Sequence, residues 1–313
     1  MFSLLGGVFL GWSLGSNDAS NVFGTAVSSR MLKFWTAAVL ASIFVVIGAL
    51  VSGQAGIETL KGLTSIRLDQ AVISSVAAVT VTIMTLLGLP VSTSQAVVGA
   101  IMGIGILNQQ INLGGLGKVV ACWVGTPVGA VIISIPLYYM VAAVYNKLNL
   151  NLFRSDSLLR FGQVAAGSYG AYALGANNVA NVTAVFVGAG LITVFFATLI
   201  GGLSIALGIL TFSKPVMETV GKKLVKLDPF SAFVVVLAHA ITVHIYTIIG
   251  VPVSTSQAVI GAVIGIGIVK GANTVSKKTL KNILLAWILT PVISCFIALV
   301  IDFTYNLHYI PHQ

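Results

Sequence analysis

The strongest constraint on the fold of this 313-residue chain is a nineteen-residue peptide that occurs twice. GLPVSTSQAVVGAIMGIGI at 88–106 returns as GVPVSTSQAVIGAVIGIGI at 250–268, with fifteen identical positions. A second pair, GSNDASNV from Gly15 and GANNVANV from Gly175, is displaced by 175 − 15 = 160 residues, against 250 − 88 = 162 for the first pair. Because both peptides keep their order and spacing, we expect two copies of one unit, residues 1–150 and 151–313.

The composition places both units in a lipid bilayer. Hydrophobic residues make up 57% of the chain and charged residues 7%, whereas a soluble domain has about 25% charged residues. Apolar windows of about 20 residues, each long enough to cross a bilayer as a helix, lie near 33–52, 119–145, 191–211 and 283–303. These windows do not alternate as the strands of an outer-membrane barrel do. The sequence predicts an all-α polytopic membrane protein.

The net charge of +9 reports on topology. Its positive residues fall between apolar segments, with no basic run beside aromatic residues, so we expect no nucleic-acid partner. Loops rich in Lys and Arg in one unit correspond to loops with few Lys and Arg in the other. This pattern indicates two inverted units of about five helices each. Cytoplasmic loops are the basic ones, and this rule puts thirteen of the sixteen Lys and Arg residues inside, all of them in loops. The linker 146–160 is then cytoplasmic and both termini lie outside.

This topology requires two hairpins that leave and return on one face, at 70–107 and 229–269. Their returning limbs are too short to span, so we expect the turns to lie within the membrane. Proline followed by Ser92 and Gln95, and again by Ser254 and Gln257, predicts a helix start with a capping box. Each tip is then a helix N-terminus, a position that binds anions.

The tips carry hydroxyl groups that could hold such an anion, from Ser92, Thr93, Ser94, Ser254, Thr255 and Ser256. Alternatively, these hydroxyls only cap the helices and bridge their neighbours, which is common in membranes. Interrupted helices at corresponding places in two halves are typical of the binding site of a secondary transporter. The duplication therefore favours a ligand site.

The other repeated peptide is rich in oxygen ligands. Asn17 and Asn21 are four residues apart and share a helical face, and Asn177 and Asn181 repeat the pair with Asn178 in place of Asp18. Amide and carboxylate oxygens suit Na⁺ and other hard cations. A lone carboxylate at membrane depth is by default functional. For the asparagines, hydrogen bonding between helices is an open alternative.

The peptides GSNDASNVFGTAV and GLPVSTSQAVVG, each present in both halves, resemble the signature of the inorganic phosphate transporter family, the sodium- or proton-coupled phosphate permeases. The resemblance covers nearly the whole chain. It implies import of inorganic phosphate by alternating access, inverted repeats and often a homodimer. We predict phosphate ligands at Asn21, Ser92, Thr93, Ser94, Asn181, Ser254, Thr255 and Ser256, and sodium ligands at Asn17, Asp18, Gln95, Asn177, Asn178 and Gln257.

Three departures from the family pattern bear on the coupling ion. Members commonly have Asp where this chain has Asn178, vertebrate members have Glu at the position of Val45, and Gln95 and Gln257 replace His. Because protonatable groups are scarce, we favour Na⁺ over protons. With no cation left in the core, a phosphate of about −2 and Asp18 would need two or three bound Na⁺ ions. No resident cofactor is expected.

Other functions compete with sodium–phosphate symport. A proton-coupled phosphate or metal-phosphate symporter, or a symporter for another oxyanion such as sulfate, fits the same motifs. An anion channel could use the same helix N-termini but needs a continuous pore. A membrane enzyme using Asp18 with His239 or His244 is disfavoured, because no fixed spacing pairs these residues.

Overall fold

The computed structural model describes residues 4–63, 75–86, 91–223, 227–271 and 277–309, and within them every regular element is a helix. The prediction of an all-α protein is confirmed for these ranges. The helices are α1 (Leu5–Ser28), α2 (Phe34–Ser52), α3 (Gln54–Lys61), α5 (Ser75–Leu86), α6 (Thr93–Leu107), α7 (Leu113–Lys147), α8 (Leu152–Gly188), α9 (Val194–Lys223), α10 (Pro229–Ile249), α11 (Thr255–Lys270) and α12 (Lys277–Tyr309).

Five of the described helices are long and apolar enough to cross a membrane. Four of them, α2, α7, α9 and α12, coincide with the predicted apolar windows, and the fifth is α10. The first helix of each half, α1 or α8, contains one copy of the repeated polar peptide and is not among these five. The molecule is therefore a multi-pass membrane protein.

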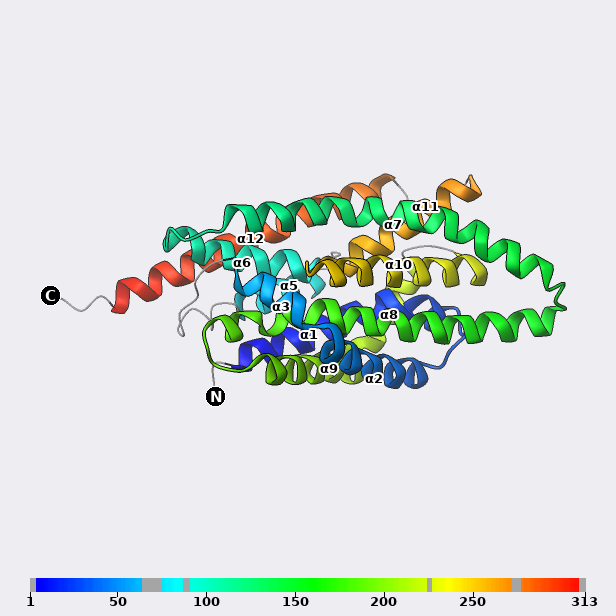
Figure 1. Cartoon of the computed structure of the whole chain (residues 1–313), viewed down its shortest axis with the longest axis horizontal. Coiled ribbons are helices and arrows are strands. Elements are labelled where there is room, and N and C mark those ends of the chain that lie inside the picture. The colour runs from blue at the N-terminus through cyan, green and yellow to red at the C-terminus, as the bar shows by residue number, and fades with distance from the viewer. Residues whose placement is uncertain (1–3, 64–74, 87–90, 224–226, 272–276, 310–313) are drawn as a thin grey trace.

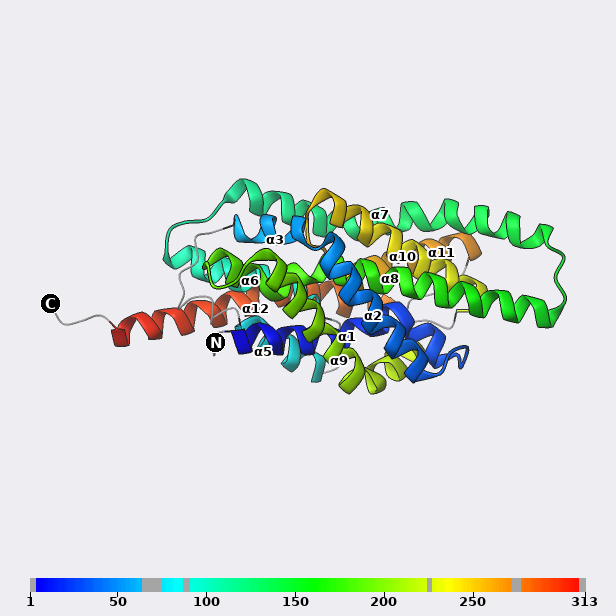
Figure 2. The ribbon, with the colours of Figure 1, turned by 60° about the horizontal axis from the view of Figure 1, so that its bottom comes forward.

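Corresponding helices of the two halves run in opposite directions. Both termini lie at one end of the molecule, and the connection between α7 and α8 lies at the other (Figure 1). Helix α7 runs away from the termini and α12 runs back towards them, and α1 and α8 are related in the same way (Figure 1). A second view shows α7 along the side opposite α1, α2 and α9 (Figure 2).

Helices of the first half pack against helices of the second half: α1 packs against α9, and α2 packs against α8. Glycines make this close packing possible. A Cβ atom on Gly15 would lie 2.0 Å from the carbonyl oxygen of Ile205, and one on Gly175 would lie 2.0 Å from that of Val45. Both members of each contact are displaced by 160 residues in the sequence. Small residues let membrane helices approach closely, and here they join one half to the other.

The second predicted hairpin is formed by α10 and α11. Asp228 caps α10 by accepting from the Ser231 amide at 3.0 Å, and Lys270, the last residue of α11, donates to the same carboxylate. The hairpin therefore begins and ends at one place. Partial burial alone would raise the pKa of Asp228, but the hydrogen bonds from Lys270 and Ser231 outweigh it and lower the pKa to about 2.

The returning limbs are short, as expected: α6 has 15 residues and α11 has 16, or roughly 23 Å of helix. The first hairpin consists of α5 and α6, and parts of the predicted stretch 70–107, the Gly88–Pro90 turn included, lie outside the described residues. The prediction that every basic residue lies in a loop is wrong. Lys147 and Arg154 belong to α7 and α8, because helical hydrogen bonding continues beyond the apolar windows.

Candidate functional site

The tips of the two hairpins meet near the middle of the molecule. They enter from opposite ends, α6 from the end with the termini and α11 from the other (Figure 1). The Ser94 hydroxyl donates to the carbonyl of Val253 at 2.9 Å, and the Ser256 hydroxyl donates to the carbonyl of Val91 at 3.5 Å. Each tip thus holds the backbone of the other by the same contact, repeated across the two halves.

Both short helices begin where the sequence predicts. Ser92 and Ser254 are the N-cap residues, and their hydroxyls accept from the amides of Gln95 at 3.4 Å and Gln257 at 3.3 Å. The second half of the predicted capping box is absent from the described contacts, since the Oε1 atoms of Gln95 and Gln257 are buried without a partner. Two acceptor oxygens therefore remain uncommitted beside the two helix N-termini.

Helix α1 supplies the contacts to the second tip. The side-chain amide of Asn21 donates to Thr255 at 3.2 Å and to Ser256 at 3.3 Å. Thr255 in turn donates to the carboxylate of Asp18 at 3.0 Å. Asp18 is only 3% exposed, so the carboxylate is held inside the bundle by a hydroxyl of the hairpin.

Helix α8 makes the equivalent contacts to the first tip, with one difference. Asn181 donates to Ser94 at 3.0 Å, as Asn21 does to Ser256, but it also donates to Oδ1 of Asn178 at 2.9 Å. The Thr93 hydroxyl and Nδ2 of Asn178 are consequently buried without partners. The half with Asn178 in place of Asp18 therefore lacks both contacts that Thr255 makes with α1, and the site is asymmetric.

The remaining two predicted ligands behave differently from each other. Asn177 donates to the carbonyl of Val253 at 2.7 Å and accepts from its amide at 3.0 Å, so it clamps the second tip. Asn17 is half-buried, and no side-chain contact fixes it among the described residues. Sequence reasoning missed the backbone of Val253, although its place inside the repeated PVSTSQ peptide was a usable signal.

The site has little positive charge and several side-chain oxygen atoms without a hydrogen-bond partner. Asn181 Oδ1 joins the two glutamine oxygens as a buried acceptor without a partner. Among the residues whose burial is described, no Lys or Arg is buried. Unpaired buried polar atoms are costly, so the two glutamine oxygens are suited to bound cations, and Asn181 Oδ1 and the free Thr93 hydroxyl are suited to a hydrogen-bonding anion.

The described contacts do not link the intramembrane histidines to Asp18. His244 is hydrogen-bonded through Nδ1 to the Tyr169 hydroxyl at 2.7 Å. His239 is fully buried and neither ring nitrogen has a partner. No described contact joins either histidine to Asp18, so the geometry does not assemble the residues of the enzyme alternative.

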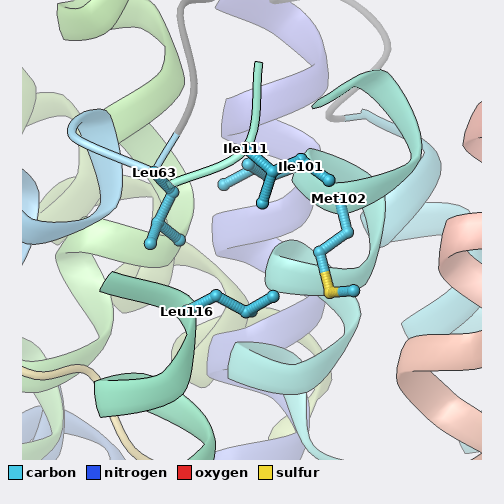
Figure 3. A pocket seen from close by; sticks show the side chains of 5 residues that line it. All are labelled: Leu63, Ile101, Met102, Ile111 and Leu116. Atoms are coloured by element: carbon cyan, nitrogen blue, oxygen red, sulfur yellow. The ribbon is translucent and has the colours of Figure 1, made fainter. Parts of the chain in front are cut away.

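A hollow elsewhere in the bundle differs from this site. It lies between the loop after α3, the end of α6 and the start of α7, and only apolar side chains line it, from Leu63, Ile101, Met102, Ile111 and Leu116 (Figure 3). With no polar group from these side chains, it offers nothing to recognise an ion.

Comparison with known proteins decides the family. Residues 14–154 and again 151–298 match the model of the Phosphate transporter family. The chain belongs to this family. Its two halves are thus repeats of one unit, and it is a transporter rather than an enzyme.

Relatives of this transporter differ in the substrate they are named for. A candidate phosphate permease of Methanocaldococcus jannaschii is 30% identical over 294 residues, 94% of each chain. A sulfate permease of Bacillus subtilis is also 30% identical, over 307 residues, 95% of this chain and 85% of the relative. A solved structure, described as the sodium-dependent phosphate transporter, matches with a TM-score of 0.87 and 24% identity over 97% of this chain and 98% of the other. That match shows the shared fold.

Proposed function

We propose that the protein imports inorganic phosphate together with Na⁺ by alternating access. The observation that carries this proposal is the meeting of two helix N-termini from opposite ends of the molecule, with Ser94 and Ser256 each bonded to the backbone of the other tip. A helix N-terminus favours an anion through its amides and its dipole. Two of them directed to one place would hold a small multivalent oxyanion without any Lys or Arg.

The phosphate would replace contacts that the tips now make with themselves and with the asparagines. Asn21 and Asn181 already donate to the tip hydroxyls, and Thr93 has a hydroxyl without a partner. Ser92 and Ser254, which cap the helices, would orient the amides. The predicted phosphate set remains a proposal, and the convergence of the two tips supports it.

Sodium would use the buried oxygens that have no partner. Gln95 and Gln257 each offer Oε1 beside a helix start, and Asp18 brings the buried negative charge. The described residues of the core supply no buried Lys or Arg to balance phosphate and Asp18, so co-bound cations would make coupling an electrostatic requirement. Asn17, Asn177 and Asn178 stay proposed sodium ligands, with Asn177 also clamping the tip.

The orientation in the membrane is proposed from charge and geometry together. Helices α1, α9 and α11 all run towards the end that holds the α7–α8 connection (Figure 1), and the thirteen basic residues are assigned to this connection and to the segments that follow these three helices. The positive-inside rule makes this end cytoplasmic and puts both termini outside. The opposed directions of α7 and α12 then support inverted repeats.

Sulfate is the second candidate substrate, because the Bacillus subtilis relative is named a sulfate permease. Both ions are tetrahedral, but phosphate near neutral pH carries a proton and can donate a hydrogen bond, whereas sulfate only accepts. A free acceptor among the donors, such as Asn181 Oδ1, therefore favours phosphate.

Uptake into proteoliposomes tests the proposal. Radiolabelled phosphate uptake should require an inward Na⁺ gradient, persist when the pH gradient is removed, and be inhibited by arsenate more than by sulfate. Counterflow of labelled phosphate would separate a transporter from a channel. Sulfate uptake that exceeds phosphate uptake would reject the substrate, and uptake driven by pH alone would reject the coupling ion.

A further inference from the structure

A groove outside the central site runs along α7 and α8 towards their connection. It has a volume of about 590 Å³, within the range of about 300–1,000 Å³ usual for small-molecule sites. Its walls are apolar side chains such as Val144 of α7 and Leu158 of α8, and Phe233 of α10 lies against it. The groove extends from Leu137 of α7 to Leu148, the residue that follows this helix, or roughly 17 Å.

Small residues form part of the α8 wall of the groove. Gly162 and Ala165 line it, and a Cβ atom on Gly162 would lie 3.1 Å from the Phe233 ring. Exposed apolar side chains continue beyond it, where Leu152 and Phe153 are 82% and 84% exposed. This surface lies where α7 and α8 extend past the neighbouring helices (Figure 1).

Positive charge lies at the connection end of the groove. A second hollow adjoins it through Leu148 and Leu158, and Arg154 lines that hollow. Lys147 ends α7 nearby, and Asn151 caps the positive end of the 37-residue α8. Arg160 is engaged with Asp156, whereas no described ion pair involves Arg154 or Lys147. The groove is therefore apolar along its length and basic at its mouth.

We propose that this groove is a binding site for an anionic phospholipid, with an acyl chain along α7 and α8 and the headgroup phosphate at Arg154, Lys147 and the start of α8. Charge complementarity selects the occupant, because basic pockets between membrane helices on the cytoplasmic side suit anionic headgroups. A guanidinium binds phosphate through two parallel hydrogen bonds, and the helix N-terminus adds its dipole. The site is independent of the transported ion.

The test compares phosphatidylglycerol with phosphatidylcholine of the same acyl chains on the purified full-length protein. Native mass spectrometry should show retention of phosphatidylglycerol over phosphatidylcholine, and phosphatidylglycerol should give the larger rise in Tm. The double variant Lys147→Gln/Arg154→Gln should lose this preference, whereas Lys118→Gln, an exposed basic residue near the opposite end of α7, should keep it. Equal retention of both lipids by the native chain, or an unchanged preference in the double variant, would overturn the proposal.

A second pair of variants tests the apolar part. Ala165→Trp fills the groove from an exposed position and should reduce retention of both lipids, while Ala121→Trp, exposed on the far part of α7, should not. The competing occupant is a second copy of the chain. Leu158→Cys in a Cys122→Ala/Cys295→Ala background should form no disulfide-linked dimer on oxidation in vesicles, and efficient disulfide-linked dimers would assign the groove to a dimer interface instead.

Discussion

Replacing Asp18 with asparagine isolates the role of the buried carboxylate, because the second half shows what the amide does at this position. Asn178 accepts from Asn181 and leaves Thr93 without a partner. The same change in the first half should turn Asn21 towards the new amide and release Thr255, which now donates to Asp18 at 3.0 Å. We therefore expect Asp18→Asn to fold and to reach the membrane.

The magnitude follows from the lost charge. A unit charge about 4 Å from a cation is worth about 4 kcal/mol at an effective dielectric constant near 20. At about 1.4 kcal/mol per tenfold change, the affinity for a sodium ion bound at Asp18 should fall about 1,000-fold. The variant also loses the charge-assisted hydrogen bond from Thr255, worth about 1.5–3 kcal/mol. The neutral contact between the new amide and Asn21 replaces part of it.

The assay is the sodium dependence of phosphate uptake in proteoliposomes, with Tm measured on the same preparations. Asp18→Asn should show no saturation over sodium concentrations that saturate the native protein. The swapped variant Asp18→Asn/Asn178→Asp should regain part of the uptake, since it returns the charge to the equivalent position. Native sodium dependence in the single variant, at unchanged Tm, would refute the assignment of Asp18 to a cation.

Three further outcomes are expected. Gln257→Leu should lower the apparent sodium affinity about tenfold while leaving Tm unchanged or higher, because it removes a buried acceptor that has no protein partner; a fall in both would mean a structural role. Gly15→Ala should lower the free energy of unfolding by about 1–3 kcal/mol, because its Cβ would lie 2.0 Å from a carbonyl oxygen of α9. Gly117→Ala is the control, since a Cβ there would meet nothing within 4 Å. Equal shifts of the denaturant midpoint in the two variants would contradict this. Asp228 has a pKa lowered from 3.8 to about 2 by Lys270 and Ser231 despite partial burial, so its contribution to stability should be complete above about pH 4 and lost as the pH falls towards 2. Thermal unfolding curves of the native protein and Asp228→Asn should converge over that interval, and a constant difference would exclude the linkage.

The sequence predicted the parts of this molecule that repeat. The duplicated peptides located both helix starts, and Ser92 and Ser254 cap them as expected. Four apolar windows became four long helices, since twenty apolar residues have few alternatives in a bilayer.

The parts that could not be predicted depend on contacts between the halves. Nothing local in the PVSTSQ peptide shows that Ser94 would bind the carbonyl of Val253, or that Asn177 would clamp the same residue. The unclosed capping boxes at Gln95 and Gln257 went against a local rule at the proposed binding site. Rules derived from single helices cannot anticipate a side chain left free for a ligand.

The packing of α1 and α2 against helices of the second half has a consequence for biogenesis. Gly15 meets its partner Ile205 only after 205 − 15 = 190 further residues have been made, which takes roughly 10–40 s at ribosomal rates of about 5–20 residues per second. During that interval α1 is inserted in the membrane without α9, the helix that packs on Gly15. A ribosome-stalled first half should therefore be degraded rapidly, and co-expression of the second half as a separate polypeptide should rescue it.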